Sequence, residues 1–459
     1  MRTCLALWNN YLLEVLHRDK FTDSFNVIEC LINNEIIAFF DGSYQSAPFK
    51  SGNKYDISRD IAVIDYEELL KEAIDQTRLL PAHLRNKLPV KDYQLDILEK
   101  LWFRHHTISL DHQTFKLVLQ IMYDKYLSLL QINRIQRIVF SEYPHTVYDY
   151  LFLLVSINLG IRCESVQPLG QLGRSHSFVI DMNNRCILPR KPDNTLTNAT
   201  EDNFISKYSD SLNNYSIDVQ NIYARNLAQT RNEYRSFLRE GDVNFVKWTC
   251  KISASLREYN LLSLEPFEIP KTPFGVFYLQ VEPESTVTPM SDFFSNQAFA
   301  VQDFYNICKV NNIRPCIKEH PHQYRGLYPY TCNRHWQSHK HITAAKKPNF
   351  YLDLSKQLPD LVFIPLSMPP LELITRSEYK LTGTLNGTVG LQSITLSKPV
   401  IEYGLAWYSY HPLVETRRYD SSSQSIESHI YLNNPVIETM GIDNPICLSN
   451  LISAIMQCI

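Results

Sequence analysis

The stretch 274–404 alternates short apolar runs with amphipathic runs, and this alternation constrains the fold more than any other feature of the chain. Short apolar runs bounded by Gly, Pro or polar residues are typical of buried strands, and the runs between them have helical spacing. Such repeated units predict a doubly wound α/β sheet, whose ligands bind beyond the carboxyl ends of the strands. The predicted strands are 276–281, 315–318, 361–365, 379–382 and 399–403, and the predicted helices lie around 299–310, 371–375 and 388–396.

The part of the chain before residue 190 shows the same alternation less regularly, which predicts a second α/β layer structure. A buried strand, a tight connection and an apolar helix that ends at Gly160 form its clearest unit. The predicted strands are 4–8, 36–40, 61–64, 137–140 and 178–180, and the predicted helices are 66–74 and 146–159.

A chain of 459 residues is about three times the ~150 residues expected of one domain, so we predict two. The first spans 1–265 and carries a helical, Asn-rich insertion around 190–260. The second spans 266–432, and the proline-bounded stretch 270–273 is the sharpest boundary. The last segment, 433–459, is predicted to cross back to the first domain.

Charge and cysteine content exclude several classes of function. The 45 Lys and Arg against 48 Asp and Glu give a net charge of −3, so there is no basic field to hold a nucleic acid backbone. The ten cysteines contain no CxxC pair, which predicts reduced thiols in a cytoplasmic protein. A secretory h-region and an apolar run of ~18 residues are both missing, so no membrane-spanning segment is expected.

A glycine cluster follows the predicted strand 379–382. Three of the 13 glycines, at 383, 387 and 390, fall within eight positions, directly after that strand and into the start of the next predicted helix. Glycine lets a backbone approach a ligand closely, and a helix N-terminus favours phosphate, with Thr384, Asn386 and Thr388 as flanking polar groups. The alternative is a tight turn whose glycines only fit the helix against the sheet. The spacing matches neither GxGxxG nor the P-loop.

Two other strand ends of the same predicted sheet carry polar groups. Lys318 and His320 lie at the end of the strand 315–318 and are candidates to clamp a phosphate, with a solvated loop as the alternative. Glu284 and Ser285 follow the strand 276–281 and are candidates to bind hydroxyl groups of a ligand, although solvated glutamates in a proline-containing loop are equally consistent.

In the first half, Glu142, His145 and Asp149 follow the predicted strand 137–140. Each is a candidate general base or nucleophile if the two halves face each other across a cleft. Alternatively, Asp149 supports the N-terminus of the helix that follows.

The His-rich stretch of the second half provides a weaker candidate, a metal site. Its residues are Cys332, His335, His339 and His341. His335 and His339 have the i, i+4 spacing of zinc ligands, but there is no HExxH and the neighbourhood is rich in lysine. A mobile acceptor-binding loop or a solvated surface therefore fits better than a metal, and no metal or other cofactor is expected.

The ordered motifs of the second half resemble the bacterial capsular polysaccharide biosynthesis family, which includes the Kdo transferases of capsule and lipopolysaccharide assembly. The motifs are Glu-Pro-Glu at 282–284, Lys-Glu-His-Pro at 318–321, the segment 371–374 and the run GTLNGTVGLQSITLSKPVIEYG at 383–404. The His-Pro element is similar to that of bacterial sialyltransferases. The resemblance covers about 274–404, and Ser-Glu-Tyr-Pro-His at 141–145 matches more weakly.

This resemblance implies a GT-B fold, in which two Rossmann-like domains face each other across a cleft. It further implies that Lys318 and His320 contact the donor phosphate, that Gly387 and Thr388 present a helix N-terminus to it, and that Glu284 lines the donor pocket. Gln392 departs from the pattern, because relatives usually have Glu there.

The expected activity is metal-independent transfer of Kdo or a related ulosonic acid from its CMP-activated form to a surface polysaccharide or glycolipid, as in capsule or lipopolysaccharide O-antigen synthesis. The leaving group of a CMP-sugar is CMP, which carries a single phosphate, so a metal is not needed to neutralise a pyrophosphate. Expected partners are the donor, a glycan or lipid-linked acceptor, and an assembly complex at the inner membrane, where the protein would be peripheral. The alternatives are a transferase that uses a UDP- or GDP-sugar and a non-catalytic carbohydrate-binding assembly protein of the same fold.

Overall fold

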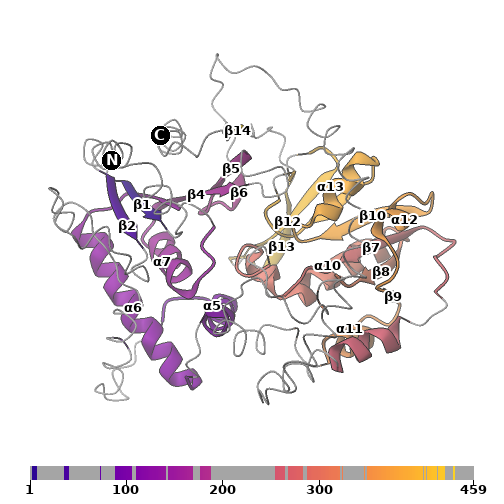
Figure 1. The fold of residues 1–459 in the computed structure, drawn as a ribbon, viewed down its shortest axis with the longest axis horizontal. Helices are drawn as coiled ribbons and strands as arrows, with labels where there is room; N and C mark the ends of the chain where they lie inside the picture. Colours follow the sequence, from indigo (N-terminus) through magenta and orange to yellow (C-terminus); the bar gives the residue numbers. More distant parts are fainter. Residues whose placement is uncertain are drawn as a thin grey trace, which may run out of the picture. The chain divides into compact units, whose positions relative to one another are not determined.

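The computed structural model describes two compact units, which Figure 1 shows in the colours of the sequence. Unit 1 comprises Met1–Asp92, Ile108–Asp193 and Pro435–Ile459, and unit 2 comprises Tyr93–Thr107 and Asn194–Asn434. Each is described by itself. The described residues are 3–7, 36–40, 73, 88–105, 110–140, 143–168, 176–187, 254–263, 267–282, 287–320, 323, 346, 349–406, 408–409, 411–420, 422–429 and 438–439.

Unit 2 is built on a seven-stranded sheet with the order β13-β12-β11-β10-β7-β8-β9. Six of its strands are parallel, and β13 pairs antiparallel with β12. Counted from β7, this is the 3-2-1-4-5-6 order of a Rossmann sheet, so the strand order reverses between β7 and β10. The strands are β7 (Phe274–Tyr278), β8 (Arg314–Lys318), β9 (Val362–Ile364), β10 (Tyr379–Thr384), β11 (Val400–Glu402), β12 (Val414–Asp420) and β13 (Ser425–His429).

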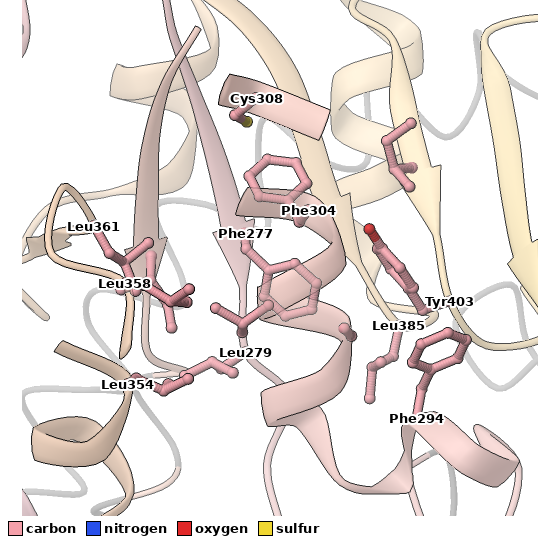
Figure 2. Close-up of a cluster of buried hydrophobic side chains, with 14 of the residues drawn as sticks. Phe277, Leu279, Phe294, Phe304, Cys308, Leu354, Leu358, Leu361, Leu385 and Tyr403 are labelled. Atoms are coloured by element: carbon pink, nitrogen blue, oxygen red, sulfur yellow. The ribbon is translucent and has the colours of Figure 1, made fainter. Parts of the chain in front are cut away.

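Helices cover both faces of this sheet. One face packs against α10 (Gln297–Val310), α11 (Phe350–Gln357) and the helical segment 254–262, and its core includes Phe277, Phe304 and Tyr403. Figure 2 shows this core, in which the rings of Phe277 and Phe304 meet edge to face with centroids 5.7 Å apart. The other face packs against α12 (Pro370–Ile374) and α13 (Thr388–Thr395).

One element of unit 2 comes from far earlier in the chain. Helix α5 (Asp92–His105) places Tyr93 edge-on against Phe293 and Tyr419, and Lys100 Nζ donates to the carbonyl of Ser295 at 3.2 Å. Phe293 precedes α10 in the short helix η3 (Asp292–Ser295). Aromatic packing therefore fixes this helix to unit 2 even though the sequence around it lies in unit 1.

Unit 1 has a second seven-stranded sheet with the order β14-β5-β4-β3-β1-β2, in which β6 (Cys186–Ile187) pairs with β5 off this path. Strands β1 to β4 pair in parallel, and β1 lies between β2 and β3, so the order reverses there. The capping box at Thr146 and Asp149 starts α7 (Val147–Asn158), which packs on α6 (His112–Ile132). The other strands are β1 (Thr3–Leu7), β2 (Ile36–Phe40), β3 (Arg137–Phe140), β4 (Arg162–Pro168), β5 (His176–Asp181) and β14 (Glu438–Thr439).

The predicted α/β class with a parallel sheet is confirmed, and all five strands and three helices predicted for 274–404 are present. One boundary was wrong: Gly383 does not start the turn but lies in β10, which continues to Thr384. Strand 61–64, the insertion around 190–260 up to residue 253, and nearly all of helix 66–74 lie outside the described residues. The domain boundary at 265, the return of 433–459 and the facing of two domains stay predictions.

Replacement of Gly383 by alanine is expected to destabilise unit 2. The new Cβ would lie 2.6 Å from Cδ2 of Phe304 and 2.7 Å from Cδ2 of Phe277, which is far inside contact distance. Overpacking of this kind costs about 1–3 kcal/mol, so urea denaturation should show a loss of that size. The double variant with Phe304→Leu should recover part of it, whereas a single variant within about 0.5 kcal/mol of the wild type would contradict the packing argument.

Candidate functional site at the carboxyl edge of the second sheet

Three neighbouring strands of unit 2 bring polar residues to one row at their carboxyl ends. Tyr278 of β7 is in register with Lys318 of β8 on one side and with Thr384 of β10 on the other. The row spans the reversal of strand order, where parallel α/β sheets bind their ligands. Residues that the chain separates by more than a hundred positions are thus held at one edge.

Lys318 is a buried cation in this row. Its side chain lies on the α12 and α13 face, two residues beyond Cys316 of the same core, and it is 2% exposed. Nζ donates to the carbonyl of Leu366 at 3.2 Å, and within the described part of the chain it has no ion pair. Burial lowers the pKa of Lys318 to about 8, against the raising effect of Glu319. A cation held this way favours an anionic ligand.

Helix α13 begins beside this row. Its N-cap, Gly387, has no side chain to cap the helix; instead, the Gly387 N–H donates to Oγ1 of Thr384 at 3.2 Å. Thr384 is fully buried, and Asn386 and Thr388 are half-buried on either side of Gly387. The N-terminus of a helix carries partial positive charge and suits an anion.

The three glycines are positions of close packing within the protein. None of Gly383, Gly387 and Gly390 has a positive φ, and at each position a side chain of the protein occupies the space of a Cβ. Phe304 and Phe277 fill it at Gly383, and Tyr408 fills it at Gly390. This packing agrees with the alternative, glycines that fit helix against sheet, and contact of the cluster with a ligand stays a prediction.

At Gly387 the occupying group is Gln280, which follows β7. A Cβ on Gly387 would lie 2.1 Å from Nε2 of Gln280, and this Nε2 donates to Oγ1 of Thr384 at 3.2 Å. The backbone of Gln280 is held in turn: its N–H donates to Oε1 of Gln297 at 2.8 Å, and its carbonyl accepts from Nε2 of Gln297 at 3.0 Å. The Gln280 carboxamide thus bridges β7 and the start of α13.

A buried ion pair lies on the opposite face of the sheet, directly after β8. Glu319 is 1% exposed and accepts from Lys346 Nζ at 2.6 Å, from the hydroxyl of Tyr351, and from the backbone N–H of His320 at 2.6 Å. Burial raises the pKa of Glu319, and the hydrogen-bonded cation opposes this shift. Lys346 also donates to the carbonyl of Gln280 at 3.4 Å. The pair therefore fixes the backbone at two strand ends.

Glu402, the last residue of β11, is a second buried acid at this edge. It is in register with Thr384 and accepts from Ser409 Oγ at 3.1 Å and from Arg418 Nη2 at 3.3 Å. Burial raises the pKa of Glu402 to about 7, although Arg418 and the hydroxyls of Ser409 and Thr416 lower it. Glu402 therefore titrates near neutral pH.

The candidate catalysts of unit 1 follow β3 and start α7. Asp149 is buried and its carboxylate is occupied: Oδ1 accepts from the N–H and hydroxyl of Thr146, both at 2.6 Å, and Oδ2 accepts from the N–H of His145 at 3.1 Å. This is the helix-supporting role given above as the alternative. His145 is half-buried, with Nδ1 3.1 Å from the carbonyl of Tyr143, and Glu142 lies outside the described residues. Their catalytic roles stay predictions.

The structure thus brings together Thr384, Asn386, Gly387 and Thr388. It places Lys318 at the end of the next strand but one, and His320 follows two residues later. The predicted residues outside the described part are Glu142, Glu284, Ser285, Cys332, His335, His339 and His341.

Sequence reasoning missed four side chains of this edge, Gln280, Glu319, Lys346 and Glu402. Gln280 and Glu319 follow buried strands, and Glu402 is the last residue of one. A polar residue at the end of a buried strand is a pattern by which the sequence could have identified all three. Lys346 gave no signal, because its partner lies 27 residues away.

No protein-family model matches the chain, and no curated protein matches it. Among solved structures, KpsC from Thermosulfurimonas dismutans, a beta Kdo 2,7 transferase, is similar over 71% of this chain and 80% of its own, at 12% identity and a TM-score of 0.27. UDP-GlcNAc 2-epimerase from Methanocaldococcus jannaschii is similar over 99% of both chains, at 11% identity and a TM-score of 0.23. At such scores these likenesses carry no functional argument, which must come from the chain itself.

None of the helices in the described ranges has the length and apolar character needed to cross a membrane.

The pH dependence of stability is expected to report on Glu402. Between pH 4.5 and about 7 the folded state keeps a proton that the unfolded state has lost, so the free energy of unfolding falls as the pH rises, by up to about 1.4 kcal/mol per unit. Urea denaturation of Glu402→Gln should lack this contribution, so its stability relative to the wild type rises over that window. The exposed variant Glu268→Gln serves as the control, and parallel curves for Glu402→Gln and wild type would contradict the assignment.

Replacement of Lys318 by methionine is expected to stabilise the protein at pH 7, by about 1–3 kcal/mol, because it removes a buried charge and keeps the side-chain volume. The gain should shrink between pH 8 and pH 10, where the folded wild type loses the Lys318 proton before the unfolded chain does. Lys380→Met, on an exposed residue near the opposite end of β10, is the matched control. A destabilised Lys318→Met protein would show that the cation serves the fold.

Proposed function

We propose that this chain is a glycosyltransferase whose activated sugar donor binds at the carboxyl edge of the sheet of unit 2. The observation that carries the proposal is Lys318, a buried cation without an ion pair among the described residues, beside the reversal of strand order. A buried charge that costs stability and has no ion-pair partner in the described part of the chain is well suited to bind an anion. The order of the motifs along 282–404 supports sugar transfer as the chemistry.

The proposed donor is a CMP-activated ulosonic acid such as Kdo. Lys318, His320 and the N-terminus of α13 at Gly387 and Thr388 would hold its phosphate, with Thr384 and Asn386 beside them and Glu284 and Ser285 at the sugar or nucleotide. Preorganised donors of this kind stabilise the negative charge that develops on the leaving phosphate, so a metal is not required in the proposed reaction. A UDP- or GDP-sugar is the alternative donor for the same groups.

The proposed acceptor is a growing surface polysaccharide or glycolipid, and unit 1 is proposed to bind it. In the first sheet the strand order reverses at β1, which pairs with β3, and ligands of such sheets bind at the carboxyl ends of the strands beside a reversal. Glu142 and His145, which follow β3, are therefore proposed to activate the acceptor hydroxyl. Asp149 would act through His145, whose backbone it holds. A GT-B arrangement of the two units, and peripheral binding at the inner membrane with an assembly complex, belong to this proposal.

Nucleotide binding separates the donors. A ligand that binds only the folded state raises the melting temperature, so CMP should stabilise the protein, and UDP and GDP should not. Lys318→Met should lose the response to CMP, whereas Lys380→Met should keep it. Stabilisation by UDP or GDP alone would overturn the CMP assignment and leave the anion site in place.

A transfer assay separates an enzyme from a non-catalytic binding protein. CMP-Kdo and a panel of other nucleotide sugars are offered with a synthetic glycolipid acceptor, and transfer is expected from CMP-Kdo. His320→Ala should reduce transfer through weaker donor binding, whereas His145→Ala should lower kcat with CMP binding unchanged. Nucleotide binding without transfer from any donor would favour the carbohydrate-binding alternative.

A further inference from the structure

Gln280 occupies the position in unit 2 where the strand order reverses. Its carboxamide crosses from the end of β7 to the N-cap of α13, where Nε2 lies at the place of a Cβ on Gly387 and donates to Oγ1 of Thr384. The side chain is 7% exposed. Any anion drawn to the N-terminus of α13 from the carboxyl edge therefore approaches this carboxamide.

The position of the carboxamide is fixed by its surroundings. Both backbone polar groups of Gln280 are hydrogen-bonded to Gln297, the first residue of α10, and the carbonyl also accepts from Lys346. Gln297 is fully buried and donates to Oε1 of Glu282 at 2.8 Å, which fixes its own amide. The backbone that carries the Gln280 side chain is thus anchored to a helix and to a buried ion pair.

For the binding of an anion, the important property of the Gln280 side chain is its charge. A glutamate has the same shape but would place a negative charge beside the helix N-terminus, whereas the carboxamide is neutral and its N–H groups are donors. We propose that Gln280 is a specificity-determining residue of the anion site, whose uncharged carboxamide admits an anionic ligand to the N-terminus of α13. The inference rests on the proposed function, because it assumes that the site binds the donor phosphate.

The test is Gln280→Glu, with CMP as the probe and the shift of the melting temperature as the readout. At pH 8 the carboxylate should weaken CMP binding more than about 30-fold, because like charges a few ångströms apart repel strongly at a partly buried site. At pH 5 protonation should restore binding toward that of the wild type at the same pH. Equal binding by the variant and the wild type at pH 8 would overturn the inference.

A second variant separates charge from structure. Gln280→Met keeps the volume without a charge, so CMP binding should fall only about three- to tenfold at both pH values, the loss of one neutral hydrogen bond. Loss as large as that of Gln280→Glu at pH 8 would make Gln280 a structural residue and overturn the inference. Gln357→Glu, at the exposed end of α11, controls for the added charge.

The same measurements distinguish this inference from the proposed function. If neither CMP nor UDP shifts the melting temperature of the wild type, both fail. If the wild type responds to CMP and Gln280→Glu responds equally at pH 8 and pH 5, only the role of Gln280 fails. If Gln280→Glu binds CMP more weakly than the wild type at pH 8 and approaches the wild type at pH 5, both are supported.

Discussion

Parallel pairing of β7 with β8 on one side and β10 on the other determines where the chemistry of unit 2 can lie. Because the chain leaves β7 toward β8 and returns later on the other side at β10, the connections diverge and leave the carboxyl ends uncovered between them. Gln280 and Thr384, 104 positions apart, meet there. The contact between these two side chains depends on this register.

Two lysines at this edge show how differently the fold treats buried charge. Lys346 is 3% exposed and forms an ion pair with Glu319. The Tyr351 hydroxyl and the His320 N–H also donate hydrogen bonds to the Glu319 carboxylate. Lys318 is equally buried, and the carbonyl of Leu366 is its one hydrogen-bond partner among the described residues. Burial without an ion pair lowers the pKa of Lys318, because the charged form is disfavoured in the folded state. A bound anion would stabilise that charged form, as the ion pair with Glu319 does at Lys346.

The strands of unit 2 could be predicted because each is a short apolar run, and the polar residues after them because ligands of such sheets bind at strand ends. What the sequence could not provide is the partner of each polar group. Lys346 meets Glu319, and Glu402 meets Arg418, only through packing and register across the sheet. The glycine cluster illustrates the same limit: its position was right, but its role depends on side chains distant in sequence.

Those glycines change the physical basis of the proposed anion site. Backbone that needs positive φ would itself create a cradle, but Gly383, Gly387 and Gly390 have ordinary backbone and admit Phe304, Gln280 and Tyr408 instead. The start of α13 is therefore set by side-chain packing on both faces of β10, with the Tyr408 hydroxyl donating to the carbonyl of Gly387. A ligand at this helix would meet a surface preorganised by the core, so substitutions within the core should alter binding as well as stability.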